Sequence, residues 1–281
     1  MPQPLAVAPQ YLLPKRLLTQ LMGKLANLHA GALTHAVIRK FVAHYGVDMA
    51  EAANSRIESY ASFNEFFTRP LRDSARPIAD APFVCPVDAA ISQFGPIEGE
   101  QIFQAKGHSY STRALLGGDA SLAQQFDHGH FATLYLAPKD YHRIHMPCDG
   151  RLRRMIYVPG DLFSVNPLTA RHVPGLFARN ERVVCVFDTP HGPFVNVLVG
   201  ATIVGSVATV WHGVVNPPRT RGIREWRYDG QDITLAKGAE MGRFLLGSTV
   251  VLLFPKNVVT FAPDWSPTRP VRLGEPMATV A

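Results

Sequence analysis

Apolar residues at helical spacing mark the beginning of the chain. Between residues 12 and 28, leucines and one methionine recur three or four residues apart, which is the period of an amphipathic helix. Pro14 falls in the expected first turn, where proline is tolerated because its missing N–H would have no helical partner. The segment is therefore predicted to be an amphipathic helix.

Two further helices are indicated before residue 75. Thr34 is suited to an N-cap and Gly46 to a helix terminator. Downstream, Ser62 and Glu65 have the spacing of a capping box and precede a pair of phenylalanines. The first 75 residues are thus predicted to be helical.

From Pro82 onward the pattern changes from helical to extended. Short β-branched and aromatic runs are separated by Pro, Gly and Asp clusters, as is typical of strands and turns. We therefore predict an α+β fold, with a mostly antiparallel, sandwich-like β body over residues 76–281 and a helical N-terminal layer over residues 1–75. The runs are "HFATLYLA", "RVVCVF", "FVNVLVGATIVGSVATVW" and "STVVLLF".

Charge is distributed unevenly along the 281 residues. The net charge is +6, and every charged residue before Asp48 is basic. A basic amphipathic helix can lie in the headgroup plane of an anionic membrane. An ordinary helical layer with a solvated basic face fits the same pattern. The charge favours anionic partners without choosing among phosphates, acidic lipid and nucleic acid.

Targeting signals and cysteine spacing bear on the expected compartment and on whether disulfides or metal sites are expected. The basic residues near the N-terminus interrupt any signal-peptide core, and no apolar run reaches the length of about 20 residues that spans a bilayer. The three cysteines are widely spaced and form no CxxC or Cys/His ligand pattern. We expect a reducing compartment, no disulfide framework and no metal site.

One apolar run raises a chemical question. In "RFLLGSTVVLLFP" (243–255), Gly247 and Ser248 interrupt a strand-like pattern, which usually marks a bulge or a close backbone approach. The alternative is that the peptide bond between them reacts, with the Ser248 hydroxyl attacking the preceding carbonyl after a neighbouring base removes its proton. Gly205-Ser206 stands in a similar run, and local chemistry does not rank the two sites.

Such a reaction would generate a protein ketone. Attack by the hydroxyl turns the amide into an ester, and β-elimination then breaks the chain and leaves a pyruvoyl group derived from Ser248. This ketone can condense with a primary amine to form a Schiff base, which accepts electrons as a carboxylate departs as CO2. Amino-acid decarboxylation is the natural use of such a group.

The wider sequence resembles one family. The segment "KGAEMGRFLLGSTVVLLF" (237–254) is similar to the processing segment of bacterial phosphatidylserine decarboxylases, with the LGST motif at residues 246–249. Other segments similar to that family follow in the expected order: "FNEFFTRPLR" (63–72), "PVDAAIS" (86–92), "QAKGHSYS" (104–111), "YHRIHMPCDG" (141–150) and "VGATIVGS" (199–206).

The resemblance implies a proenzyme that cuts itself between Gly247 and Ser248. Its β chain would be residues 1–247 and its α chain residues 248–281, beginning with the pyruvoyl cofactor. It implies conversion of phosphatidylserine to phosphatidylethanolamine at the cytoplasmic face of the bacterial inner membrane. The expected partners are phosphatidylserine, an anionic membrane surface and a second αβ unit in a homodimer, with no nucleic acid.

The resemblance also implies roles for four side chains. Asp88, His145 and Ser248 carry over as the self-cleavage triad, in which Asp88 orients His145 and His145 deprotonates Ser248. His142 carries over as the residue that serves decarboxylation, by proton delivery. Without the resemblance, Asp88 after Pro-Val would be read as a turn residue, and both histidines as structural or surface groups.

Other interpretations stay open at this stage. A Ser/His/Asp hydrolase could use Ser248 on an external acyl group, although the chain has no G-x-S-x-G elbow there. A non-catalytic membrane-binding module would use the basic helices alone. His108 and His212 could line a substrate site or simply be packed, and Thr249 could contact the reacting peptide or fill a strand position.

Overall fold

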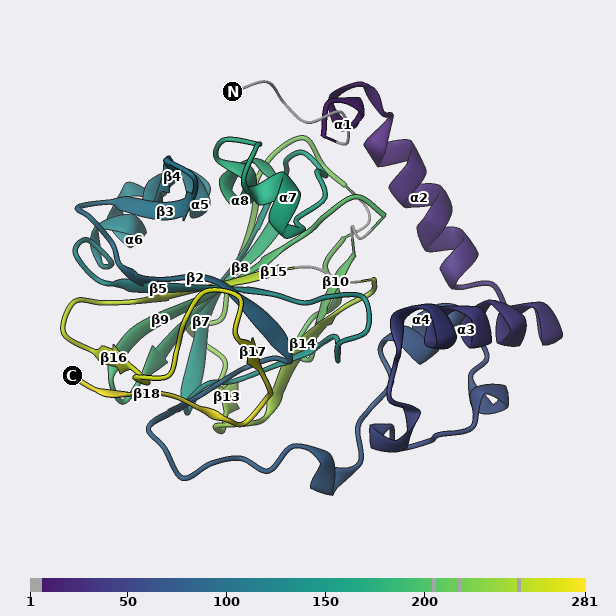
Figure 1. Ribbon diagram of the computed structural model, residues 1–281. Helices are drawn as coiled ribbons and strands as arrows, with labels where there is room; N and C mark the ends of the chain where they lie inside the picture. The colour runs from purple at the N-terminus through teal and green to yellow at the C-terminus, as the bar shows by residue number, and fades with distance from the viewer. Residues whose placement is uncertain (1–6, 204–205, 217–218, 247–248) are drawn as a thin grey trace.

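A computed structural model describes residues 7–203, 206–216, 219–246 and 249–281. The β body forms most of the molecule, and the N-terminal helices lie along one side of it (Figure 1). The predicted α+β class with antiparallel sheets and a helical N-terminal layer is confirmed. The helices are α1 (Pro9–Leu12), α2 (Lys15–Ala26), α3 (Ala32–Tyr45), α4 (Phe63–Phe67), α5 (Thr112–Leu115), α6 (Ala120–Gln124), α7 (Pro167–Ala170) and α8 (Leu176–Arg179), with 3-10 turns η1 (Met49–Glu51), η2 (Ile57–Ser59) and η3 (Asp73–Ala75).

Two details of the first helices differ from the prediction. Pro14 does not lie within one continuous helix, since it separates α1 from α2. Thr34 is not an N-cap, because α3 already begins at Ala32 after Gly31, whose φ is 54°. The Thr34 hydroxyl instead accepts a hydrogen bond from the Ala30 N–H at 3.1 Å. A proline and a left-handed glycine therefore set these helix boundaries.

The other two helix signals are confirmed. Gly46 ends α3 in the left-handed conformation, with a φ of 66°. Ser62 caps α4 by accepting the Glu65 N–H at 3.1 Å, and the Glu65 carboxylate accepts the Ala61 N–H at 2.7 Å. These bonds fix α4, and with it Phe67 and the chain that follows.

The largest sheet is antiparallel throughout and runs in the order β12-β7-β8-β9-β15-β5-β2-β17, with β13 also paired to β7. All six residues of β15 are buried, because the strand lies between β9 and β5 and both faces of the sheet are covered. The strands of this sheet are β2 (Ala89–Pro96), β5 (His130–Tyr135), β7 (Gly150–Val158), β8 (Arg182–Thr189), β9 (Gly192–Val199), β12 (Arg224–Arg227), β13 (Thr234–Leu235), β15 (Thr249–Phe254) and β17 (Pro270–Val271).

Three smaller sheets complete the body. One of them, β11-β10-β14-β6, contains His145 at the end of β6, and His142 immediately precedes that strand. Helices α5 to α8 interrupt the strands, so the segment after residue 76 is not purely β. The smaller sheets contain β1 (Phe83–Val84), β16 (Val259–Phe261) and β18 (Pro276–Val280); β6 (Arg143–His145), β10 (Val207–Thr209), β11 (Gly213–Val214) and β14 (Glu240–Phe244); and β3 (Gln101–Ala105) with β4 (His108–Ser111).

The core forms a separate cluster on each side of the main sheet. Alternate residues of β15 enter different clusters: Val250 and Leu252 pack in one, and Val251 and Leu253 in the other, as the twofold period of a strand requires. A third cluster joins the helical layer to the body and contains Leu246. The chain just before the predicted cleavage site is thus packed against the N-terminal helices.

Candidate functional site

The predicted cleavage pair, Gly247 and Ser248, lies outside the described residues, but both flanking residues are described. Leu246 has a φ of 111°, a conformation that costs a non-glycine residue about 1–3 kcal/mol. Its side chain is 6% exposed and clusters with Phe66 and Phe67. On the other side, Thr249 begins β15, and its buried hydroxyl has no hydrogen-bond partner among the described residues.

Strand pairing places the two histidines beside opposite ends of β14. The Phe244 N–H donates to the His142 carbonyl at 3.0 Å, so His142 lies beside the end of β14 that leads to Leu246. His145 pairs with Glu240 at the beginning of the same strand. Of the two backbone positions, that of His142 is therefore closer along the sheet to the predicted cleavage site.

His142 is completely buried and has a fixed tautomer. Its Nδ1 lies 2.7 Å from the Asp140 carbonyl oxygen, and because a carbonyl only accepts, Nδ1 carries the proton. Its Nε2 is then a lone-pair base, and it has no partner among the described residues. Burial lowers the pKa of His142 to about 3, while the Phe67 ring packs against it with centroids 4.1 Å apart. The site thus holds a neutral imidazole with a free basic nitrogen.

His145 is partly exposed and is held at both ring nitrogens. Its Nδ1 donates to the Gly238 carbonyl at 2.7 Å, so its Nε2 accepts from the Tyr141 hydroxyl at 3.1 Å. Burial lowers the pKa of His145. Its orientation therefore comes from a backbone carbonyl and a tyrosine.

Asp88 makes no hydrogen bond to His145 among the described residues. The Asp88 carboxylate accepts from Arg76, with Nε at 2.9 Å and Nη2 at 2.5 Å, and from the Leu273 N–H at 2.9 Å. The two segments are nevertheless adjacent, because the His145 N–H donates to the Pro86 carbonyl. The charge of Asp88 is among the smaller influences on the pKa of His145 and partly opposes the lowering by burial.

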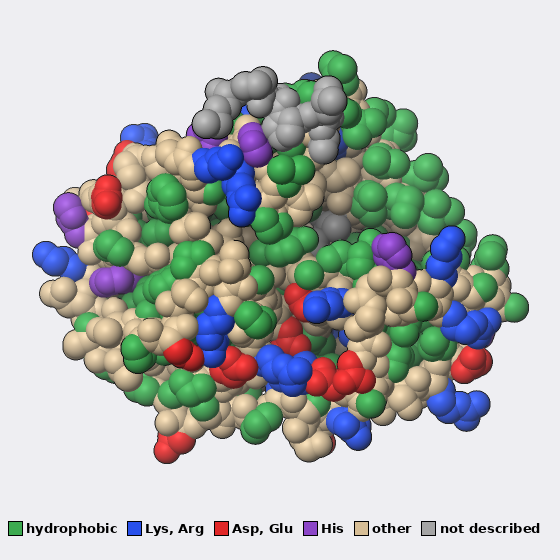
Figure 2. All heavy atoms as spheres, viewed as in Figure 1, with side chains coloured by type: hydrophobic (Ala, Val, Ile, Leu, Met, Phe, Trp, Pro, Cys, Tyr) green, Lys and Arg blue, Asp and Glu red, His purple; other side chains and the backbone are tan. Residues whose placement is uncertain are grey.

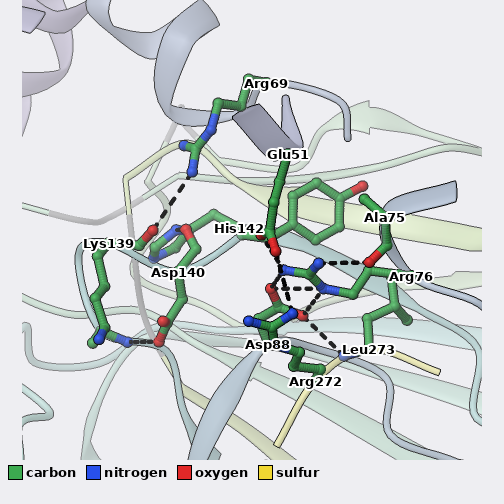
Figure 3. Close-up of polar contacts among 12 residues, drawn as sticks. Glu51, Arg69, Ala75, Arg76, Asp88, Lys139, Asp140, His142, Arg272 and Leu273 are labelled. Atoms are coloured by element: carbon green, nitrogen blue, oxygen red, sulfur yellow. Dashed lines mark hydrogen bonds and ion pairs between the residues drawn. The ribbon is translucent and has the colours of Figure 1, made fainter. Parts of the chain in front are cut away.

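Arg76 extends this contact into a network of three chain segments (Figure 3). Its Nη2 also lies 2.6 Å from the Glu51 carboxylate, which in turn contacts Arg272 at 3.2 Å. Burial alone would lower the pKa of Arg76, but its bonds to Asp88 and Glu51 raise it. The network joins the helical layer, the Asp88 segment and the C-terminal segment around Leu273.

An apolar cavity of about 680 Å³ opens between the helical layer and the body. It reaches the site, since Phe67 and Leu246 both line it. Pockets of this volume commonly hold small ligands. The remaining lining is mostly aliphatic and aromatic and includes Leu25, Leu28, Leu33, Val37, Phe41 and Phe63.

Sequence reasoning missed several parts of this site. Tyr141, next to a predicted histidine, and Arg76, 12 residues before Asp88, carried no signal that distinguished them from other tyrosines and arginines. The two carbonyls that hold the histidines belong to the backbone, so no residue type announces them. His108, at the start of β4, and His212, which packs on Trp226 with centroids 4.8 Å apart, have no described contact with the four predicted residues.

Comparison with known proteins gives matches across nearly the whole chain. Residues 63–279 match the family model described as phosphatidylserine decarboxylase, and residues 5–46 match a model described as PSD. The chain belongs to the phosphatidylserine decarboxylase family. It is 71% identical over 277 residues to the phosphatidylserine decarboxylase proenzyme of Dechloromonas aromatica, covering 99% of this chain and 98% of that protein.

Other members of the phosphatidylserine decarboxylase family are equally similar. The proenzyme of Variovorax paradoxus is 71% identical over 276 residues, covering 98% of each chain. That of Herminiimonas arsenicoxydans is 69% identical over 278 residues, covering 99% of this chain and 95% of the relative. The family resemblance seen in the sequence is thus confirmed, and it makes this chain an enzyme, a decarboxylase.

The family matches cover both parts of the structure. The longer match includes Asp88, both histidines and the Gly247-Ser248 pair, and the shorter one includes α1, α2 and α3. None of the described helices is both long and apolar enough to cross a bilayer.

Proposed function

We propose that this chain is a self-processing proenzyme that converts phosphatidylserine to phosphatidylethanolamine and CO2. Identity of 71% with proteins named phosphatidylserine decarboxylase proenzyme supports the substrate. The observation that carries the self-processing step is Leu246, which is buried with a φ of 111° one residue before the predicted scissile bond. Strain in the backbone next to this bond would be relieved when the chain is cut.

Self-cleavage would proceed at Gly247 and Ser248. The Ser248 oxygen attacks the Gly247 carbonyl carbon, the C–N bond breaks, and an ester and a free amine form. A base then removes the Ser248 α-proton, and the Cβ–O bond breaks to leave a carboxylate on Gly247. The remaining dehydroalanine tautomerises and hydrolyses, releasing ammonia. Strain at Leu246 and proton transfer by a nearby base both favour the first step.

Asp88 and His145 are proposed to serve this cleavage, as the motif resemblance implies. Their segments are adjacent in the body; burial lowers the pKa of His145, and the Asp88 charge partly opposes this shift. The Tyr141 hydroxyl, 3.1 Å from His145 Nε2, extends the reach of that ring for proton transfer. His145 would accept the proton from Ser248 and hold it near Asp88.

The residues beside the predicted cleavage site fit a pyruvoyl group. Within the described ranges, the buried Thr249 hydroxyl has no partner and can donate to a carbonyl oxygen, and His142 Nε2 is a buried acceptor that also has none there. When present, the pyruvoyl group would supply a carbonyl that captures the substrate amine and takes up the electrons left by CO2. Leu246 and Phe67 would close the apolar side of the site.

His142 is proposed to move the proton during decarboxylation. Because its Nδ1–H is held by the Asp140 carbonyl, only Nε2 can exchange a proton. Nε2 would deliver a proton to the α-carbon after CO2 leaves. Burial lowers the pKa of His142, so a proton carried on Nε2 is given up readily.

The helical layer is proposed to dock on an anionic membrane surface at the cytoplasmic face. Hydrophobic side chains gather over the N-terminal helices (Figure 2), among them Leu12 of α1, Leu17 of α2 and Leu33 of α3, which are 89%, 65% and 66% exposed. Exposed apolar groups beside Lys24 and Arg39 match a lipid interface. The expected homodimer of processed chains remains a prediction from the resemblance.

Histidine variants test the separate roles proposed for His142 in decarboxylation and His145 in self-cleavage. Purified chain mixed with phosphatidylserine vesicles should yield phosphatidylethanolamine, and Ser248→Ala should yield none. His142→Ala should still self-cleave but lose decarboxylation by at least a hundredfold, whereas His145→Ala should remain uncut. The matched control is His108→Ala, outside the site, which should keep both steps. Decarboxylation by His142→Ala at the wild-type rate would refute its role.

A further inference from the structure

Arg69 is a buried arginine whose donors are left largely unused. Its side chain is 4% exposed, and its Nε has no hydrogen-bond partner among the described residues. Its Nη2 makes one long bond, at 3.5 Å, to the Lys139 carbonyl. The guanidinium also lies over the Phe66 ring, 5.2 Å from its centroid. No acidic side chain pairs with it among the described salt bridges.

Two other shielded arginines show how this fold normally satisfies such a group. Arg182, 3% exposed, donates to three backbone carbonyls at 2.6–2.8 Å. Arg76 donates to Asp88 and Glu51. A buried guanidinium without such partners is destabilising. Among the described residues, Arg69 therefore has a desolvated positive charge that no hydrogen-bonded carboxylate compensates.

The position of Arg69 relates this charge to the site. Lys139, whose carbonyl it approaches, precedes Asp140, the residue that holds His142 (Figure 3). Phe67, two residues before Arg69, packs on His142 and lines the apolar cavity. Arg69 thus lies two residues after a side chain that contacts both the apolar cavity and His142, and it approaches the residue before Asp140.

We propose that Arg69 binds the phosphate of the lipid headgroup. The inference rests on the proposed function and adds that the acyl chains enter the cavity while the serine amine reaches the reacting carbonyl. In such a lipid the phosphodiester lies between the acyl chains and the amine, and Arg69 follows Phe67, whose ring contacts both the cavity and His142. A guanidinium presents a planar set of donors suited to phosphate oxygens.

The serine carboxylate is a poorer ligand for this arginine. Its negative charge leaves the carboxylate during decarboxylation, so a cation bound to it would stabilise the substrate more than the transition state. The phosphate keeps its charge throughout the reaction. Binding it at Arg69 supplies affinity without opposing the departure of CO2.

The test compares two amphiphilic inhibitors in wild type and Arg69→Gln. Dioctanoyl-phosphatidylethanolamine has the phosphate and amine, and O-dodecylserine has the amine and carboxylate without a phosphate. In Arg69→Gln we expect the KM for phosphatidylserine and the inhibition constant of the phosphatidylethanolamine to rise at least tenfold, with that of O-dodecylserine unchanged. Weakened binding of O-dodecylserine alone, or a fall in kcat with KM unchanged, would overturn the proposal.

Two further measurements separate this proposal from folding and from self-cleavage. Arg72→Gln, an exposed arginine in the same segment, should leave both inhibition constants unchanged. Because Arg69 is uncompensated, Arg69→Met should keep or raise the melting temperature, whereas a structural role would lower it. Calorimetry with uncut Ser248→Ala and dioctanoyl-phosphatidylethanolamine needs no cleavage, and there Arg69→Gln should raise Kd at least tenfold. An unchanged Kd in that experiment would reject the phosphate site whatever the fate of the cleavage proposal.

Discussion

Arg76 holds the carboxylate of Asp88 through two nitrogens, with Nε at 2.9 Å and Nη2 at 2.5 Å from its oxygens. Both side chains are largely shielded from solvent, and the Leu273 N–H completes the carboxylate's partners. The residue expected to assist self-cleavage is thus also a structural link between the N-terminal and C-terminal parts of the chain. Its substitution should affect stability as well as chemistry.

Removal of Arg76 should leave a buried carboxylate without its main partner. We expect Arg76→Gln to lower the free energy of unfolding by about 3 kcal/mol, measured by urea denaturation of the Ser248→Ala chain so that cleavage does not interfere. The control is Arg39→Gln, which breaks an exposed pair with Glu58 and should cost less than about 1 kcal/mol. Equal losses in the two variants would argue against a buried link.

Strain at Leu246 should contribute to the rate of self-cleavage. Leu246→Gly allows a φ of 111° without penalty, and we expect cleavage to slow about tenfold if about 1.4 kcal/mol of strain is lost. Leu246→Ala is the matched control, because it removes the same packing but keeps a Cβ and therefore the strain. The measurement is the rate of appearance of the two chains on a gel. Equal rates in the glycine and alanine variants would show that strain has no part.

Much of the fold could be predicted from local patterns. The capping box at Ser62 and the terminator Gly46 depend on nearby backbone, and both are confirmed. The prediction of Thr34 as an N-cap was wrong because the helix begins earlier, after Gly31. The backbone conformation of Gly31 determines this boundary. The apolar run within β15 predicted the strand but not its neighbours, since pairing with β5 and β9 depends on the whole sheet.

The site was only partly accessible to sequence reasoning. Motif resemblance found Asp88 and both histidines, because those residue types carry the chemistry. It did not reveal that Arg76 binds the Asp88 carboxylate. Nor did it reveal that the carbonyls of Gly238 and Asp140 accept hydrogen bonds from the two histidine rings. Those partners meet only after the strands pair, so no local pattern in the sequence could indicate them.

Asp140 should make stability depend on pH. Burial raises the pKa of its carboxyl to about 6, from an ordinary value of 3.8. A raised pKa favours the folded state when the group is protonated, and this contribution is lost as the pH rises from about 4 through 6. Asp140→Asn should therefore stabilise the fold by about 1 kcal/mol at pH 8, allowing for partial solvent screening, and by little at pH 4.

Urea denaturation of Ser248→Ala with and without Asp140→Asn measures this effect at the two pH values. Asp80→Asn is the control, because Asp80 is exposed and lies outside the site; it should change stability little at either pH. A gain from Asp140→Asn that is as large at pH 4 as at pH 8 would contradict the assignment.

Exposed leucines on α2 should carry membrane docking. We expect Leu17→Asp combined with Leu21→Asp to weaken binding to anionic vesicles at least tenfold, because each change removes an apolar contact and adds a repelled charge. Self-cleavage should continue. Val280→Asp makes a comparable apolar-to-acidic change at an exposed position of β18 and should leave sedimentation with vesicles unchanged. Loss of binding in both cases would point to a general charge effect.

The central claim is that the chain cuts its own backbone at Gly247-Ser248, and intact-mass analysis of freshly purified protein tests it most directly. The wild type should give two polypeptides, residues 1–247 and a shorter chain that begins with a blocked, ketone-bearing residue derived from Ser248. Ser206→Ala should be cut in the same way, and Ser248→Ala should remain whole. A wild-type chain that stays at full length while it still releases CO2 from phosphatidylserine would contradict the account.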